Sequence, residues 1–305
     1  LAFVGTVITA LTFSLTLTGV TSWMHIAMPI SAVVLLGISL ASTDPAAIIP
    51  SFKTLLFRNA RVKHIAVSES ALNDVIGALI TGIFLVLFVA DYAPSSIFEA
   101  YKILLTFDNV LAIIKVIFIG AAAGIAGYYI LNTWSKWKEQ MDSEGEADAA
   151  LFLAVPLFTF TVATIFGGNG FLAVFIAGLL FQLRSHVAHV EHFFNHTIEG
   201  FMKPLIFMLL GTLVNFDTLR EFAGLGIIMG ILFMLVLRPL AVFLSLSPFT
   251  MGKHKLTLKE LLFLSFVRET GVIPAVLLVS IKVAGIPGID IALAVGMWVI
   301  LLTLV

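Results

Sequence analysis

Long apolar runs alternate with short polar stretches along most of the chain. The runs occupy about 1–20, 25–52, 65–90, 108–131, 149–166, 171–183, 201–214, 222–246, 260–283 and 289–305. A helix needs about 20 apolar residues to cross a bilayer core of about 30 Å, and most of the runs reach or approach that length. The pattern therefore predicts an all-α, polytopic membrane protein with about ten membrane segments, of which the sixth and seventh are short for a straight span.

The overall composition agrees with a chain that lies in a lipid bilayer. Hydrophobic residues make up 60% of the sequence and charged residues only 11%, which is too little polar surface for a soluble protein of this length. The net charge of −1 gives no reason to expect nucleic-acid binding. The chain has no cysteine, which excludes disulfides and thiolate metal sites.

Basic residues in the polar loops predict how the chain is oriented. Eleven lysines and arginines lie in one set of alternate loops, whereas the other set holds three, Lys102, Arg220 and Lys282. Cytoplasmic loops are enriched in lysine and arginine, so the first set and both chain ends are predicted to be cytoplasmic, as in a protein of the plasma (inner) membrane. The chain begins and ends inside apolar runs, and we therefore expect it to be a fragment.

Asp44, Glu69 and Asp74 lie inside long apolar runs, and an arginine, Arg268, lies inside another. Such groups cost several kcal/mol in hydrocarbon, so they are rare there and usually mark ion or proton pathways. At 1.5 Å per helical residue from the nearest cytoplasmic lysine, Asp44, Asp74 and Arg268 lie roughly 13–17 Å deep, near the midplane. Three separate segments thus bring charge to a similar depth.

Two of these segments also contain residues that interrupt a helix. One carries Thr43-Asp44-Pro45, and the other carries Arg268-Glu269-Thr270-Gly271 followed by Pro274. Proline removes an amide donor and clashes with the preceding turn, so both helices are predicted to unwind there. Each interrupted segment is the middle member of a triplet of segments, which is typical of a transporter site between inverted repeats.

The third segment provides polar groups for such a site. Glu69 and Asn73 share one helix face because they are four residues apart, and Ser70 and Asp74 form the next such pair. Together with the break that precedes Pro45, this face offers the oxygen ligands that hard cations prefer.

The motifs Thr43-Asp44-Pro45, Glu69-Ser70-x-x-Asn73-Asp74 and Arg268, with the stretches 167–178 and 204–211, resemble those of sodium/proton antiporters of the NhaP and NHE type. The resemblance covers essentially the whole chain. Members of that family have about thirteen spans, with the fifth and twelfth broken. The resemblance therefore implies that about three N-terminal helices precede this fragment.

The resemblance also implies a mechanism. The protein is expected to exchange Na⁺, or Li⁺, for H⁺ without any cofactor or resident metal, with cation and proton competing for Asp74. A core around 25–90 and 222–305 would move against a dimerisation domain of a homodimer. Arg268 would compensate the charge of Glu69 or of Glu269, and Asn73 beside Asp74 favours electroneutral, one-for-one exchange. The residues expected to bind cation or proton are Asp74, Asn73, Glu69, Ser70, Thr43 and Asp44.

Other interpretations stay open at this point. A K⁺/H⁺ antiporter of the same fold fits the same motifs. An intramembrane aspartyl protease would use Asp44 and Asp74 as a dyad, although no Gly-x-Gly-Asp motif surrounds the second aspartate. Arg238-Pro239 predicts a further kink, to which we assign no role. Four histidines in one loop fit a metal site, a pH-sensing linker or a solvated connector, and they are His186, His189, His192 and His196.

Overall fold

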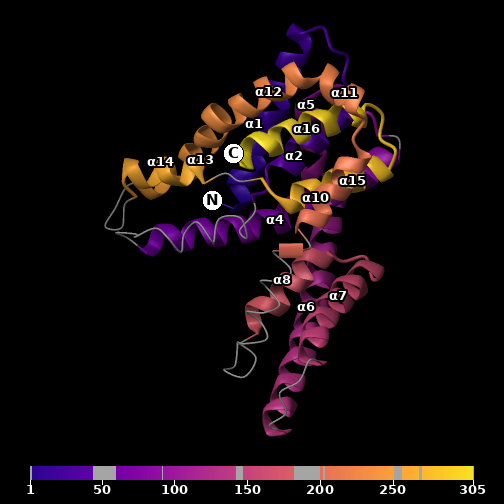
Figure 1. The fold of residues 1–305 in the computed structure, drawn as a ribbon, viewed down its shortest axis with the longest axis vertical. Coiled ribbons are helices and arrows are strands. Elements are labelled where there is room, and N and C mark those ends of the chain that lie inside the picture. The colour runs from indigo at the N-terminus through magenta and orange to yellow at the C-terminus, as the bar shows by residue number, and fades with distance from the viewer. Residues whose placement is uncertain are drawn as a thin grey trace. The chain divides into compact units, whose positions relative to one another are not determined.

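The computed structural model of the chain describes residues 2–43, 60–90, 92–141, 147–181, 200–201, 203–250, 256–267 and 270–304. All regular elements within these ranges are helices (Figure 1). In chain order they are α1 (Ala2–Trp23), α2 (Ile30–Leu40), α4 (Ala60–Val89), α5 (Ile97–Lys102), η1 (Ile103–Leu105), α6 (Phe107–Met141), α7 (Ala147–Ile165), α8 (Gly170–Leu180), α10 (Lys203–Leu213), α11 (Phe216–Glu221), α12 (Ala223–Leu232), η3 (Phe233–Leu237), α13 (Arg238–Leu246), η4 (Ser247–Thr250), α14 (Leu258–Phe266), α15 (Val272–Val283) and α16 (Ile289–Leu304).

Each predicted apolar segment contains a helix, so the all-α, polytopic fold class is confirmed. Within the described ranges, four helical stretches are long and apolar enough to cross a membrane, namely Ala2–Trp23, Arg61–Val89, Phe107–Trp137 and Ala223–Leu246. The other apolar helices have 10–17 residues, and they include the predicted short sixth and seventh segments.

Both predicted interruptions coincide with helix ends. In the second segment, α2 ends at Leu40, and Ser42 and Thr43 are irregular. In the ninth segment, α14 ends at Phe266 and α15 begins at Val272. Asp44, Pro45, Arg268 and Glu269 themselves lie outside the described residues.

The eighth segment contains one wide turn. Helix α12 continues through the π-helical turn η3 into α13, and the amide of Arg238 bonds to the carbonyl of Phe233, five residues back. Pro239 follows directly and has no amide hydrogen to bond to the carbonyl of Leu235, so a regular α-helix would be interrupted here in any case. The kink predicted at Arg238-Pro239 therefore takes the form of a π-turn, a feature that is frequent at functional sites.

The chain forms two compact units, of which unit 1 comprises residues 1–103 and 205–305. Helix α2 lies at the centre of unit 1, where it packs against α1, α4, α15 and α16, and its residues from Ala32 to Leu40 are all buried. Figure 1 shows α16 running beside α2 and α12, with α1 near the same helices. A helix that is apolar on all sides and enclosed by others is a core helix. The first break follows the end of α2 and therefore lies next to the centre of unit 1.

Unit 2 comprises residues 104–204 and contains the helices α6, α7 and α8. The three helices pack closely because glycines on α6 leave room for the backbone of α8. A Cβ atom on Gly120 would lie 2.8 Å from the carbonyl oxygen of Asn169, and one on Gly124 would meet the carbonyl oxygen of Ala173 at 2.5 Å. Small residues at these positions allow the helix axes to approach within the membrane.

Candidate functional site

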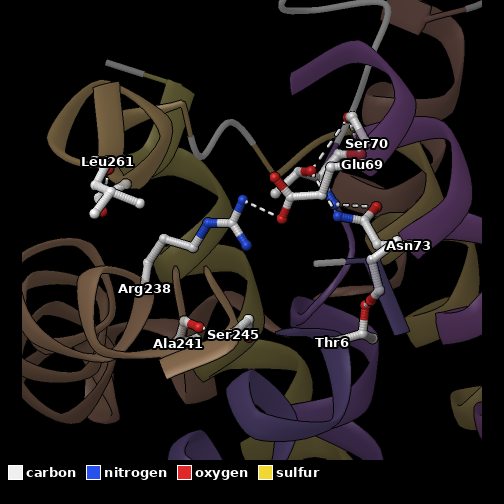
Figure 2. Close-up of polar contacts among 11 residues, drawn as sticks. Thr6, Glu69, Ser70, Asn73, Arg238, Ala241, Ser245 and Leu261 are labelled. Atoms are coloured by element: carbon white, nitrogen blue, oxygen red, sulfur yellow. Dashed lines mark hydrogen bonds and ion pairs between the residues drawn. The ribbon is translucent and has the colours of Figure 1, made fainter. Parts of the chain in front are cut away.

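Helix α4 carries the wall of polar side chains that its i, i+4 spacing predicts. Glu69, Ser70 and Asn73 are all buried, although each carries a polar group, and Asp74 follows Asn73 with a partly buried side chain. Buried polar groups need hydrogen-bond partners, so the structure around these residues indicates their roles. Figure 2 shows Glu69, Ser70 and Asn73 along one side of α4.

Asn73 and Ser70 hold the unwound chain at the first break. The amide of Thr43 donates to Asn73 Oδ1 at 3.1 Å, and Asn73 Nδ2 donates back to Thr43 Oγ1 at 2.8 Å. Ser70 Oγ donates to the carbonyl oxygen of Thr43 at 2.7 Å, and Thr43 Oγ1 donates to Ser70 Oγ at 3.1 Å. The amide, carbonyl and hydroxyl of Thr43 are therefore all bonded to α4, which replaces the helical bonds that the break removes.

Ser42 adds a further contact between the break and α4. Its hydroxyl donates to the main-chain carbonyl of Asn73 at 3.2 Å. This approach requires a glycine one turn further along, because a Cβ atom on Gly77 would collide with Ser42 Oγ. The sequence stretch Ser42-Thr43 is thus fixed against α4 by four side chains, and we call these hydrogen bonds of Ser42, Thr43, Ser70 and Asn73 the break clamp.

The carboxylate of Glu69 forms an ion pair with Arg238 of α13. Arg238 Nη2 lies 2.6 Å from Glu69 Oε1, and the two residues are only 2% and 6% exposed (Figure 2). A buried charge needs a partner, and an arginine–carboxylate bond at this distance is charge-assisted and short.

A cluster of apolar side chains lies next to this ion pair. On α4 the cluster contains Val62 and Ala66, which lie two turns and one turn before Glu69. On α13 it contains Val242 and Leu246, which lie one and two turns after Arg238. Leu256, and Leu261 and Leu264 of α14, complete it. Since water is kept away on this side, the attraction between the two charges is screened less than it would be at the surface.

Arg238 is the ion-pair partner of Glu69 that the sequence reasoning missed. We expected Arg268 to compensate either Glu69 or Glu269, and among the described residues Arg238 pairs with Glu69. Arg238 stands inside an apolar segment just as Arg268 does, so the criterion that selected Arg268 was available for it as well. Arg268 and Glu269 lie outside the described residues.

The predicted cation and proton ligands are thus partly brought together. Thr43, Ser70 and Asn73 bond to one another, and Glu69 and Asp74 lie on the same helix, α4. Asp44 follows Thr43 in the sequence but lies outside the described residues. The four clustered histidines lie outside them too, and the described part of the chain contains no group of three or more His, Asp or Glu residues that is placed to hold a metal ion.

An all-helical membrane bundle with two interrupted helices, and with buried acidic and basic groups beside one of them, has the architecture of a secondary transporter. Sequence comparison identifies the family within this class. The profile of the family described as "Sodium/hydrogen exchanger, transmembrane" matches residues 1–305, and the chain belongs to this family.

Relatives with curated names include antiporters for both potassium and sodium. The chain is 27% identical over 274 residues to the K(+)/H(+) antiporter NhaP2 of Shewanella oneidensis, covering 88% of this chain and 44% of that protein. It is 28% identical over 286 residues to the K(+)/H(+) antiporter NhaP of Alkalimonas amylolytica, covering 89% and 44%. It is 26% identical over 261 residues to the Na(+)/H(+) antiporter 1 of Methanocaldococcus jannaschii, covering 82% and 56%. The chain therefore spans about half the length of these relatives or less.

A solved structure has the same fold. The sodium proton antiporter MjNhaP1 from Methanocaldococcus jannaschii, determined at pH 8, superimposes with a TM-score of 0.72 at 24% sequence identity. The match covers 100% of this chain and 76% of that chain, which confirms the helical fold over the whole length.

Proposed function

We propose that this protein is a secondary antiporter that exchanges Na⁺, or Li⁺, for H⁺ across the membrane. Membership of the sodium/hydrogen exchanger family supports the proposal. The observation that carries it is the ion pair between Glu69 and Arg238, in which the arginine neutralises one of the two carboxylates on helix α4. In this proposal Asp74, whose side chain is partly buried on the same helix, is the carboxylate whose charge changes during exchange.

The break clamp provides the oxygen atoms of the proposed site. A carbonyl oxygen has two lone pairs, and the carbonyl of Thr43 uses one to accept the bond from Ser70. We assign the cation to Asp74 and Asp44 together with these neutral oxygens, because hard monovalent ions prefer oxygen ligands. When Asp74 is protonated it no longer attracts the cation, so proton and cation compete for it.

Charge balance supports one-for-one exchange. An aspartate in place of Asn73 would add another titrating charge. The side-chain oxygen and nitrogen of Asn73 are both hydrogen-bonded to Thr43. Arg268 and Glu269 are the charge-compensating residues of the second break in this proposal, and their opposite charges sum to zero. Exchange of one cation for one proton at Asp74 then moves no net charge.

Potassium is the second candidate cation, and the names of the two NhaP relatives from Shewanella oneidensis and Alkalimonas amylolytica favour it. An aspartyl protease that uses Asp44 and Asp74 gains no comparable support. It would also leave the ion pair of Glu69 with Arg238 without a purpose.

We further place the protein in the plasma (inner) membrane as a homodimer, with both ends of this chain in the cytoplasm. The bias of lysine and arginine toward one set of loops supports the orientation. Accessibility labelling of single cysteines added to the cysteine-free chain tests it, and labelling of both ends from outside the cell would contradict it.

Proton flux in proteoliposomes tests the proposed exchange. The full-length protein is reconstituted with an internal pH dye and challenged with Na⁺, Li⁺, K⁺ and, as a control, choline. We expect Na⁺ and Li⁺ to drive proton movement and Asp74→Asn to abolish it, because this change removes the titrating acid and keeps the shape. Asp217→Asn, at an exposed position on α11, is the matched control and should transport normally.

The outcomes separate the alternatives. Flux with K⁺ alone would establish the potassium exchanger instead, and no flux with any cation would refute antiport. Undiminished flux in a folded Asp74→Asn variant would move the exchanging acid to another residue. A potential clamped with valinomycin should leave wild-type flux unchanged, since each uncompensated charge would add about 2.3 kcal/mol per 100 mV.

A further inference from the structure

The second break is held by a side chain from a different helix. Thr270 lies in the interruption between α14 and α15, and its amide donates to Thr303 Oγ1 of α16 at 3.3 Å. The hydroxyls of Thr270 and Thr303 are also in hydrogen-bond contact. Both residues are buried, with Thr270 0% exposed. An amide in an unwound stretch has lost its helical acceptor, and Thr303 supplies one.

The geometry fixes the direction of these bonds. Thr303 Oγ1 donates its own hydrogen to the carbonyl of Ile300 at 2.9 Å. Because a hydroxyl has a single hydrogen, Thr303 accepts from both the amide and the hydroxyl of Thr270. The Thr303 hydroxyl thus donates one hydrogen bond and accepts two. The bond to Ile300 in its own helix orients its lone pairs toward Thr270 in the second break.

Thr21, another buried threonine of unit 1, provides a contrast. The hydroxyl of Thr21 on α1 lies within hydrogen-bond distance of the carbonyls of Leu17 and Thr18, both in its own helix, and it can donate its hydrogen to either. Threonine in an apolar helix ordinarily satisfies its hydroxyl in this way. Thr303 does the same through Ile300, and in addition it joins α16 to the interrupted segment.

Helix α16 is well placed to position the break because it also packs against α2, from which the first break emerges. The approach is close at Gly296, where a Cβ atom would lie 2.7 Å from Leu278 of α15 and 3.1 Å from Leu36 of α2. The helix that holds Thr270 is therefore in van der Waals contact with the helix that leads into the break clamp.

We propose that Thr303 is a positioning residue for ion exchange, which holds the second break to α16 through Thr270. Thr270 lies in the interruption between α14 and α15, so its two bonds to Thr303 fix this part of the second break to α16. The inference rests on the proposed antiport function, and it adds a residue from the last helix to the machinery of that function.

Three variants test the role of the Thr303 hydroxyl. Thr303→Val keeps the shape and removes the acceptor, Thr303→Ser keeps the acceptor, and Thr21→Val removes a buried hydroxyl that bonds only within its own helix. We expect Thr303→Val to speed hydrogen exchange of the Thr270 amide about tenfold, since a buried donor loses its partner. Thr303→Ser and Thr21→Val should leave that amide protected.

Transport measurements provide the second readout. In Thr303→Val the apparent KM for the cation and the pH profile of flux should shift by a factor of several, while Thr303→Ser restores both. An unchanged amide exchange rate and pH profile in Thr303→Val would overturn the proposal, and so would a serine variant that behaves like the valine variant. If Thr303→Val fails to fold, Thr270→Val removes one of the two bonds and should shift the pH profile in the same direction. No shift there would also overturn the proposal.

The two hypotheses fail in different ways. Wild-type protein without any cation-driven flux would refute the proposed function, whereas the amide exchange experiment still tests the anchor in that case. A transporting protein whose Thr303→Val variant matches the wild type in both readouts refutes the positioning role alone.

Discussion

The ion pair between Glu69 and Arg238 gives a sharp prediction for stability. Arg238→Met keeps an unbranched apolar stem and removes the charged guanidinium, leaving the carboxylate of Glu69 in a site where that residue is only 6% exposed. At an N to O distance of 2.6 Å, the Coulomb attraction is about 6 kcal/mol for an effective dielectric constant of about 20. Desolvation offsets part of this attraction in the intact pair. Deleting one partner of a buried pair is therefore expected to lower the free energy of unfolding by about 3–5 kcal/mol.

The double variant distinguishes a broken pair from lost packing. Glu69→Gln alone leaves a buried guanidinium whose Nε already has no hydrogen-bond partner among the described residues, so it should also destabilise strongly. Glu69→Gln combined with Arg238→Met removes both charges, and a neutral replacement of a buried pair is often tolerated. We expect the double variant to be at least about 2 kcal/mol more stable than the sum of the single effects predicts.

Chemical denaturation in detergent micelles, followed by the fluorescence of the four tryptophans, measures these differences. Arg220→Met, at an exposed position on α11, is the matched control and should change stability by about 0.5 kcal/mol or less. If Arg238→Met unfolds at the same denaturant concentration as the wild type, the ion pair does not hold the fold. Strictly additive effects in the double variant would refute the coupling.

Three further predictions concern helix α4 and the start of helix α5. Gly77→Ala should lower the free energy of unfolding by about 1–3 kcal/mol, because the added Cβ atom would displace Ser42. Gly82→Ala lies on the same helix with open space around it and should be neutral or stabilising. If Gly82→Ala is the more destabilising of the two, the close approach of Ser42 to Gly77 is contradicted. Asn73→Asp should cost about 1–3 kcal/mol because the amide donor to Thr43 is lost; equal midpoints in denaturant would show that the break clamp does not need it. Hydrogen bonds from a neighbouring serine hold the pKa of Glu99 below its usual range. Protection of the Ser95 amide from hydrogen exchange, which donates to the Glu99 carboxylate just before α5, should therefore be present above the ordinary glutamate pKa and be lost as the pH falls through the lowered one. Glu99→Gln should remove this dependence, and a pH-independent protection in the wild type would speak against it.

Much of the fold is encoded in local patterns that can be read from the sequence. The lengths of the apolar runs predict the helices, because crossing a bilayer requires a minimum apolar length. The breaks follow from proline and glycine within two of the runs, since neither residue continues a helix well. The α4 wall follows from the spacing of Glu69, Ser70, Asn73 and Asp74, because residues three and four apart share a helix face. Each of these inferences uses residues that are close together in the chain.

The partners across helices could not be predicted in the same way. Glu69 and Arg238 are 169 residues apart, and their contact depends on how the two helices that carry them are brought together, which no local pattern encodes. Thr303 gives even less signal, since a threonine in an apolar helix is normally satisfied by its own backbone. The hydrogen bonds between Asn73 and Thr43 could not be predicted either, because an asparagine at this position fits an ion ligand as well as a residue that holds the break.

The break clamp has a consequence for how the proposed site selects its cation. Thr43 and Ser70 hold each other by two hydrogen bonds, and Asn73 holds both the main chain and the side chain of Thr43. Such a frame cannot contract around a small ion or expand around a large one without breaking buried hydrogen bonds, and a donor left unsatisfied costs about 1–3 kcal/mol. In the proposed mechanism, the spacing of the frame sets the preference between Na⁺ and K⁺, whereas Asp74 sets the competition with the proton. It follows that substitutions which displace the clamp should change the ratio of sodium to potassium transport before they abolish transport, while substitutions of Asp74 should abolish both together.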